Sequence, residues 1–354
     1  MTDLPAPRPD TQIEAPEPAP KARRRWLVPV IVSAGVVVLL GAGAGITYSV
    51  VAGQRTPEAV VSSYLNELVG GDAAAARTWM TALPEGNPVL LQPDTYAAVT
   101  DPISDFTVID TDIDGTDAEA TVEFVQGSET YTQELTLSLI KRDLGVFDVW
   151  RVDGSNLPNV YVSFARPDGM DLSVNGTDFG VLVGSYEYDV PALPGTYTFT
   201  PEGTTEFYTA EPVTVTIRFE GPDSTTSVAL PVTLTEAGAA SAQAAVNAYL
   251  DSCLAQPVLA PSGNCGFSIA QDDATYTNVR WTLLVRPTVS FGDYRSGRGW
   301  AVIPETPGSM RLDADYELPG EYGTAEGTIS GFKQSGFVTV DEAGVATFES
   351  VIYE

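Results

Sequence analysis

The sequence predicts an α+β protein with one N-terminal transmembrane helix, followed by two helix-plus-antiparallel-sheet domains that flank a small β-sandwich. Three observations lead to this prediction. Residues 26–53 contain no charged side chain. Apolar residues recur at helical spacing soon after residue 56 and again after residue 240. Short runs rich in Val, Thr, Tyr and Phe, separated by turn residues, fill most of the remaining sequence.

The uncharged stretch predicts a membrane span. Its 28 residues would form a helix of about 42 Å, and a bilayer core is about 30 Å thick. Lys21 and the arginines at 23–25 precede it, whereas only Arg55 closely follows it, so we expect a cytoplasmic N-terminus and an extracytoplasmic bulk. A cleaved signal peptide is the alternative, but its apolar core is only about 7–15 residues long.

Two further predictions concern the segment before this span and a glycine pair within it. Residues 1–25 contain six prolines and charges of both signs, which predicts a disordered cytoplasmic tail. Gly41 and Gly45 form a GxxxG pair that can pack two membrane helices, and this allows a weak homo-oligomer.

Residues 54–155 are predicted to form a helix-plus-sheet domain. Thr56 is predicted to be the N-cap of a helix, with Pro57 at the first helical position. Gly70 and Gly71 are predicted to end this helix. Asp72 can cap a second helix. The predicted strands cover residues 106–112, 116–124, 130–139 and 146–152.

The phrase PEAVVSSYLNELVGGDAAAARTWM, with a later strand that ends in VWRVDG, resembles the nuclear-transport-factor-2-like (cystatin-like) fold. Such domains often follow a single anchor helix in actinobacterial envelope proteins. The resemblance therefore implies a single-pass, membrane-anchored envelope protein with cystatin-like extracytoplasmic domains. Enzymes of that family commonly use an Asp or His at the mouth of a cone. This sequence has no histidine, so the resemblance assigns no catalytic residue.

Two further domains are expected. Residues 156–237 lack a helical pattern and show short strands, with a hairpin turn at Asn175-Gly176, which predicts a β-sandwich-like domain. Residues 238–354 begin with a helix over 240–254 and continue in strands. Val246-x-x-Tyr-Leu repeats the spacing of Val61-x-x-Tyr-Leu, so we expect a diverged second copy of the first domain; chance similarity between amphipathic helices is the alternative.

Cys253 and Cys265 are the only cysteines. An even count beyond the predicted membrane span favours a disulfide in an oxidising compartment. Closing a loop of this size contributes about 3 kcal/mol in the chain-entropy model. A redox pair is the alternative, although the spacing is far from C-x-x-C.

The composition excludes several classes of function. Lys and Arg number 18 against 47 Asp and Glu, a net charge of −29, which is too acidic for a nucleic-acid binder. Without histidine and with two cysteines, a histidine-ligated or multi-cysteine zinc site and an iron–sulfur cluster are excluded, and no cofactor is predicted. The acidic residues serve solubility, or they attract cations or a basic partner.

Asp110, Asp112 and Asp114, followed by Gly115, match the first half of a calcium-binding loop. Position twelve of that loop requires a glutamate, and here it is Thr121. A β-hairpin that turns at Asp114-Gly115 explains the same residues and is favoured.

Arg295 and Arg298 lie next to Trp300 in the sequence. Two guanidinium groups beside aromatic rings can bind an anionic or planar group. Ion pairs across a hairpin are the alternative.

These observations favour a non-enzymatic, membrane-anchored binding or scaffolding protein of the bacterial cell envelope, with an envelope protein or the cell wall as its partner. No nucleophile–base set or phosphate-binding loop is present. One alternative is an envelope sensor that captures a ligand in a cone-shaped cavity. Another is a hydrolase or isomerase that works with carboxylates alone.

Overall fold

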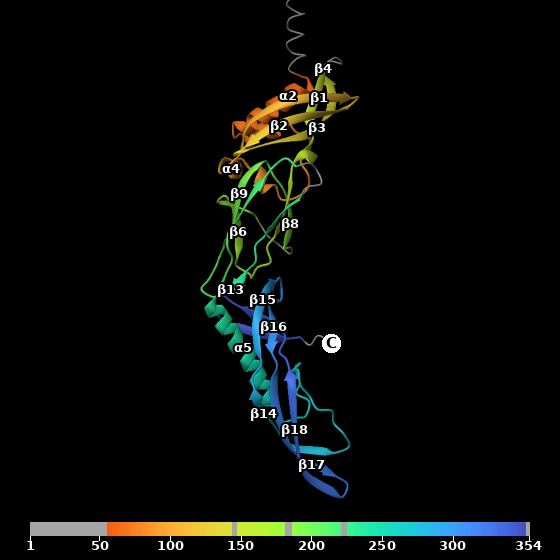
Figure 1. The fold of residues 1–354 in the computed structure, drawn as a ribbon, viewed down its shortest axis with the longest axis vertical. Helices are drawn as coiled ribbons and strands as arrows, with labels where there is room; N and C mark the ends of the chain where they lie inside the picture. Colours follow the sequence, from red (N-terminus) through yellow and green to blue (C-terminus); the bar gives the residue numbers. More distant parts are fainter. Residues whose placement is uncertain (1–54, 144–146, 181–185, 221–224, 352–354) are drawn as a thin grey trace, which may run out of the picture. The chain divides into compact units, whose positions relative to one another are not determined.

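The computed structural model describes residues 55–143, 147–180, 186–220 and 225–351, and these residues are mainly β structure (Figure 1). Strands hold 50% of them and helices 17%. They form six small sheets with four α-helices and two short 3-10 helices. The α+β prediction is therefore wrong. The prediction gave two amphipathic helices too much weight. A sheet contains many more residues than the single helix that covers it, so strand residues predominate.

The first helix, α2 (Pro57–Val69), has the predicted cap. The side chain of Thr56 accepts a hydrogen bond from the amide of Ala59, and Pro57 occupies the first turn. One face of α2 is buried, and it consists of Val60, Val61, Tyr64, Leu65 and Leu68. Three short helices follow, which are α3 (Ala73–Arg77), η1 (Pro88–Leu91) and α4 (Pro93–Ala97).

A four-stranded antiparallel meander follows, in the order β1-β2-β3-β4, and α2 contacts β1, β2 and β4 (Figure 1). Its strands are β1 (Ile103–Asp114), β2 (Asp117–Gln126), β3 (Glu129–Asp143) and β4 (Phe147–Val152). All four strands that the sequence predicts for this stretch are present. In β2, buried and less buried residues alternate, as expected for a sheet with one face on a core.

The middle stretch contains short strands and a single helical turn, η2 (Gly154–Asn156). The strands are β5 (Asn159–Ser163), β6 (Asp171–Val174), β7 (Thr177–Asp178), β8 (Glu187–Pro191), β9 (Gly195–Glu202), β10 (Tyr208–Thr209), β11 (Val213–Ile217), β12 (Thr225–Ala229) and β13 (Thr233–Leu234). They pair in the orders β11-β9-β6-β7, β12-β5-β8 and β10-β13. Asn175 and Gly176 connect β6 to β7 with φ angles of 49° and 80°, which confirms the predicted hairpin turn.

The last stretch begins with α5 (Glu236–Leu254), capped by Thr235. It starts four residues before the predicted position 240 and contacts β14, β19 and β20. The strands are β14 (Thr275–Val285), β15 (Thr288–Arg295), β16 (Gly299–Thr306), β17 (Gly308–Leu318), β18 (Glu321–Phe332), β19 (Gly336–Val340) and β20 (Ala346–Ser350). They pair in the orders β14-β17-β18 and β15-β16-β19-β20.

The prediction of a second copy of the first helix-plus-sheet domain is wrong, and so is the pair of cystatin-like domains built on it. The strands after α2 pair in chain order within one sheet, whereas those after α5 divide between two sheets. Val246 and Leu250 are buried as Val61 and Leu65 are. The Val-x-x-x-Leu spacing that the two helices share therefore indicates a buried helix face, and it does not specify which sheet packs against that face.

The predicted membrane span at residues 26–53 lies outside the described residues, as do the predicted tail at 1–25 and the pair Gly41 and Gly45. Among the residues that the structure does describe, no helix is long and apolar enough to cross a bilayer.

Two hydrophobic clusters stabilise the described chain. The larger contains residues from α2, the first meander, the middle sheets and the β15-β16-β19-β20 sheet. The smaller contains Leu250, both cysteines, Trp281 and Met310. The domain boundaries near residues 155 and 237 stay predictions.

Candidate functional site

A pocket of about 560 Å³ lies where the β15-β16-β19-β20 sheet meets the chain that follows β5. We call it the Trp300 pocket. Its lining residues are Pro167, Asp168, Tyr208, Tyr294, Trp300, Thr339, Val340, Asp341, Glu342, Ala343, Val345 and Thr347. Aromatic rings and carboxylates thus come together from four separate parts of the sequence.

Two tyrosine rings contact the ring of Trp300 in the Trp300 pocket. Trp300 is 1% exposed, and its indole N–H donates to the carbonyl of Val232 at 3.0 Å. The ring centroid of Tyr294 lies 4.8 Å from that of Trp300 in an edge-on arrangement, and the centroid of Tyr208 lies 5.7 Å away. These contacts fix the aromatic part of the pocket before any ligand arrives.

The local sequence explains how Trp300 reaches this position. Trp300 pairs with Tyr294 on β15 and with Val338 on β19. The preceding Gly299 has a φ of +101°, and a Cβ there would lie 2.2 Å from the carbonyl oxygen of Val338. Only glycine allows this close approach of β16 to β19.

Three exposed carboxylates belong to the same pocket, those of Asp168, Asp341 and Glu342. The Asp341 carboxylate accepts hydrogen bonds from the amides of Ala343 and Val345, at 2.9 and 2.8 Å, and so orders the turn between β19 and β20. No ion pair within the described residues includes any of the three carboxylates. None of the three therefore has a direct ionic partner within the described residues.

The tyrosines are affected by this surrounding charge. Burial raises the pKa of Tyr294 above its ordinary value, and the negative charge of Asp168 raises it further, while the positive charge of Arg166 lowers it. Burial also raises the pKa of Tyr208, and Glu342 adds to that rise. Both phenols are thus neutral at physiological pH, and the carboxylates give the pocket a negative potential.

Neutral aromatic rings next to unpaired carboxylates favour a cationic ligand group. A ring face attracts an ammonium or guanidinium group by about 0.5–2 kcal/mol, depending on how far the group loses its water. Nearby carboxylates add Coulomb attraction. In the part of the chain that the structure describes, no Asp or Glu is buried. The three carboxylates of the pocket are thus accessible to a ligand.

The sequence-predicted ligand residues do not form one site. Trp300 lines the pocket, whereas the guanidinium carbons of Arg295 and Arg298 lie 5.7 and 5.3 Å from the ring centroid of Phe337. Phe337 pairs with Ala301, the neighbour of Trp300. Successive side chains of a strand point to opposite sheet faces, so the arginines and Trp300 lie on different faces.

The predicted metal residues lie along one exposed strand. Asp110, Asp112 and Asp114 belong to β1, and the first two accept hydrogen bonds from the next residue's amide at 2.9 and 3.0 Å. Asp114 pairs with Asp117, so Gly115 and Thr116 form the hairpin loop, one residue beyond the predicted turn. Within the described ranges, no group of three or more acidic or cysteine side chains is arranged to hold a metal ion.

The predicted disulfide is confirmed. Cys253, near the C-terminus of α5, is joined to Cys265, and both are buried in the smaller hydrophobic cluster. The described chain contains no free cysteine.

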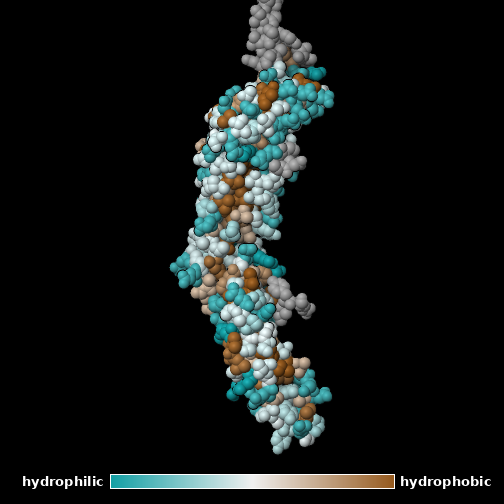
Figure 2. Space-filling model, in the orientation of Figure 1, coloured by the Kyte–Doolittle hydropathy of each residue, from teal (hydrophilic) through white to brown (hydrophobic). Residues whose placement is uncertain are grey.

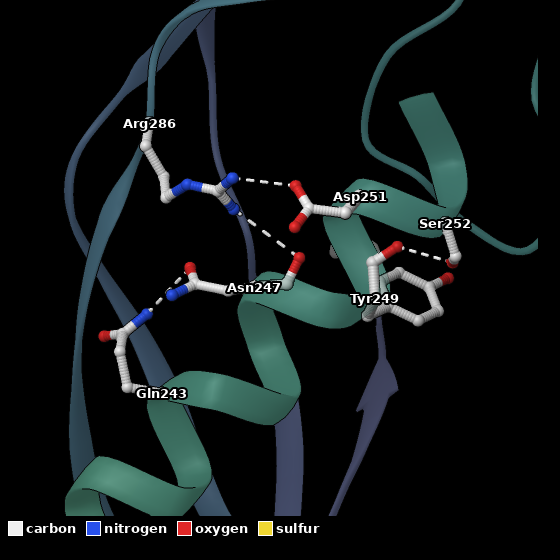
Figure 3. Close-up of polar contacts among 6 residues, drawn as sticks. All are labelled: Gln243, Asn247, Tyr249, Asp251, Ser252 and Arg286. Atoms are coloured by element: carbon white, nitrogen blue, oxygen red, sulfur yellow. Dashed lines mark hydrogen bonds and ion pairs between the residues drawn. The ribbon is translucent and has the colours of Figure 1, made fainter. Parts of the chain in front are cut away.

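A second group of polar side chains lies along α5 and is shown in Figure 3. Arg286, just after β14, forms a 2.7 Å ion pair with Asp251 and donates to the carbonyl of Asn247 at 3.5 Å. Gln243 donates to the Asn247 side chain at 3.2 Å. These groups are already bonded to one another, so they join α5 to the end of β14 and are not a binding site.

Sequence reasoning missed most of the Trp300 pocket. Asp168, Tyr208 and the adjacent pair Asp341 and Glu342 are separated by long stretches of chain, and none belongs to a recognisable motif. The only local signal is the turn sequence Asp-Glu-Ala-Gly at 341–344, which predicts a turn and no ligand.

Comparison with known proteins identifies no matching family, no matching curated protein and no matching solved structure. The resemblance to actinobacterial envelope proteins therefore stays a prediction.

Proposed function

We propose that this chain is a non-enzymatic, extracytoplasmic binding protein that captures a cationic group in the Trp300 pocket. The observation that carries the proposal is the combination of three packed aromatic rings with three carboxylates that have no cationic partner among the described residues. A pocket with polar groups at its opening and apolar groups inside is typical of ligand sites. The pocket therefore favours capture of a ligand group over a purely structural scaffold.

The charge of the whole chain supports the same ligand class. A net charge of −29 attracts cations over distances longer than the pocket itself. On the face drawn in Figure 2, hydrophilic and intermediate residues predominate, and the hydrophobic residues form small separate patches. This visible face suits a charged partner better than a broad apolar one.

The confirmed disulfide supports the extracytoplasmic part of the proposal. Disulfides persist in oxidising compartments and are rare where cellular thiols are kept reduced.

A basic segment of an envelope protein is the kind of partner that we propose. An exposed lysine or arginine side chain from such a segment has the charge and size for a pocket of about 560 Å³.

The direct test is a titration of the full chain with tetramethylammonium, followed by the indole N–H signals of isotope-labelled tryptophan. We expect the signal of Trp300 to shift saturably, because its ring lies in the pocket. The double variant Asp168→Asn, Glu342→Gln should weaken binding on the order of tenfold, since two carboxylates are neutralised.

The matched control is Asp117→Asn, Glu119→Gln, which changes the net charge equally on exposed residues of β2. We expect it to alter the affinity by less than about twofold, because exposed charges beyond a Debye length are screened. Equal weakening in both double variants would show a general charge effect and overturn the pocket. The absence of any saturable shift would overturn it as well.

A further inference from the structure

The sheet face opposite Trp300 carries an unusual buried ring. Phe337 on β19 is 2% exposed, yet it belongs to neither of the two hydrophobic clusters formed by the described residues. Arg295 and Arg298 lie over its ring, with guanidinium carbons 5.7 and 5.3 Å from the centroid. Among the cation–π contacts of the described residues, this is the only ring that receives two arginines.

The β15–β16 turn sets the spacing of the two arginines. Arg295 ends β15, and its carbonyl accepts a hydrogen bond from the amide of Arg298 at 3.0 Å. Gly297 lies between them with a φ of +71°, a conformation that favours glycine. The backbone therefore presents both side chains from one short turn, and Phe337 gives their guanidinium groups a common surface.

Neither arginine has an acidic partner within the described residues. Six other cations form ion pairs there, including Arg286 with Asp251 and Arg311 with Asp313. Glu349 pairs with Phe337 across the sheet, but it forms no ion pair with the arginines. The two exposed guanidinium groups on this ring therefore keep N–H donors that no acidic side chain of the described residues occupies.

We infer that Arg295 and Arg298 form an oxyanion-binding pair that accepts a single carboxylate or phosphate group. Arginine stacked on an aromatic ring directs the planar edge of its N–H donors outward, and that edge matches the oxygens of either group. The acidic net charge repels extended polyanions, so the ligand class is an isolated oxyanion. This site lies on the opposite sheet face from the Trp300 pocket and does not depend on the proposed function.

The test follows the side-chain N–H signals of isotope-labelled arginine in the full chain. Arg295→Lys and Arg298→Lys each remove one signal and so assign the pair, and Arg311→Lys assigns an ion-paired reference. Titration with inorganic phosphate, and separately with acetate, is compared with chloride at equal ionic strength. We expect the Arg295 and Arg298 signals to shift saturably while the Arg311 signal does not.

Either single lysine variant should weaken phosphate binding on the order of tenfold, because it loses the paired N–H donors but keeps the charge. A response to phosphate alone, or to acetate alone, identifies which oxyanion the pair selects. Two results would overturn the inference: arginine signals that follow chloride as closely as phosphate, or lysine variants that bind phosphate as tightly as the parent chain. Either result would mean that the two arginines shield Phe337 from solvent and do not bind an oxyanion.

Discussion

Helices α2 and α5 look alike in sequence but have different surroundings. Both begin at a threonine whose side chain accepts an amide hydrogen bond three residues later. Both bury a valine and a leucine at the same spacing. Yet α2 packs on a meander whose strands follow in chain order, whereas α5 contacts β19 and β20 near the end of the chain.

The difference shows how limited local helix signals are. A cap and an apolar stripe decide where a helix begins and which face is buried. They do not decide which strands cover that face. Around α2 the covering residues belong to the larger hydrophobic cluster, whereas the C-terminal part of α5 depends on a smaller cluster with a disulfide.

The largest expected effect comes from removing one buried leucine from each helix. Leu65→Ala in α2 should lower the free energy of unfolding by about 3–5 kcal/mol, because the larger cluster encloses the cavity on all sides. Leu250→Ala in α5 should cost about 2–3 kcal/mol, since the chain after Cys253 is mostly loop and can close over the space. Urea unfolding of the full chain measures both. A greater loss for Leu250→Ala would reverse the comparison.

The next effect concerns the disulfide. Replacing both cysteines by alanine should lower the free energy of unfolding by about 3 kcal/mol, because a closed loop of this size no longer restricts the unfolded chain. Hydrogen exchange should become faster at the C-terminal end of α5 and in the loop up to Cys265, and α2 should be unchanged. Equal acceleration in both helices would contradict the separation of the two clusters.

The smallest effect tests buried hydroxyl groups on the α2 side. The Tyr64 hydroxyl is buried and has no hydrogen-bond partner among the described residues, whereas that of Tyr197 donates to the carbonyl of Leu193 at 2.9 Å. Tyr197→Phe should cost about 1 kcal/mol in unfolding free energy, while Tyr64→Phe should change it by less than about 0.5 kcal/mol or stabilise the chain. A loss for Tyr64→Phe as large as that for Tyr197→Phe would mean that the Tyr64 hydroxyl has a bonding partner in solution.

The sequence by itself determined the features that depend on neighbours in the chain. Thr56 and Asp72 cap helices as predicted, Asn175 and Gly176 make the predicted turn, and Cys253 bonds to Cys265. Each of these follows from backbone geometry or chain closure over a few residues.

Only the tertiary structure decided the pairing of sheets and the composition of the site. Trp300 and its neighbouring arginines are close in sequence, but Trp300 lies on one sheet face and the arginines lie over Phe337 on the other, because successive strand residues point to opposite faces. Asp168 and Asp341 are far apart in sequence and line one pocket. Strand pairing and packing between distant segments produce these contacts, and no local pattern encodes which distant segments will meet.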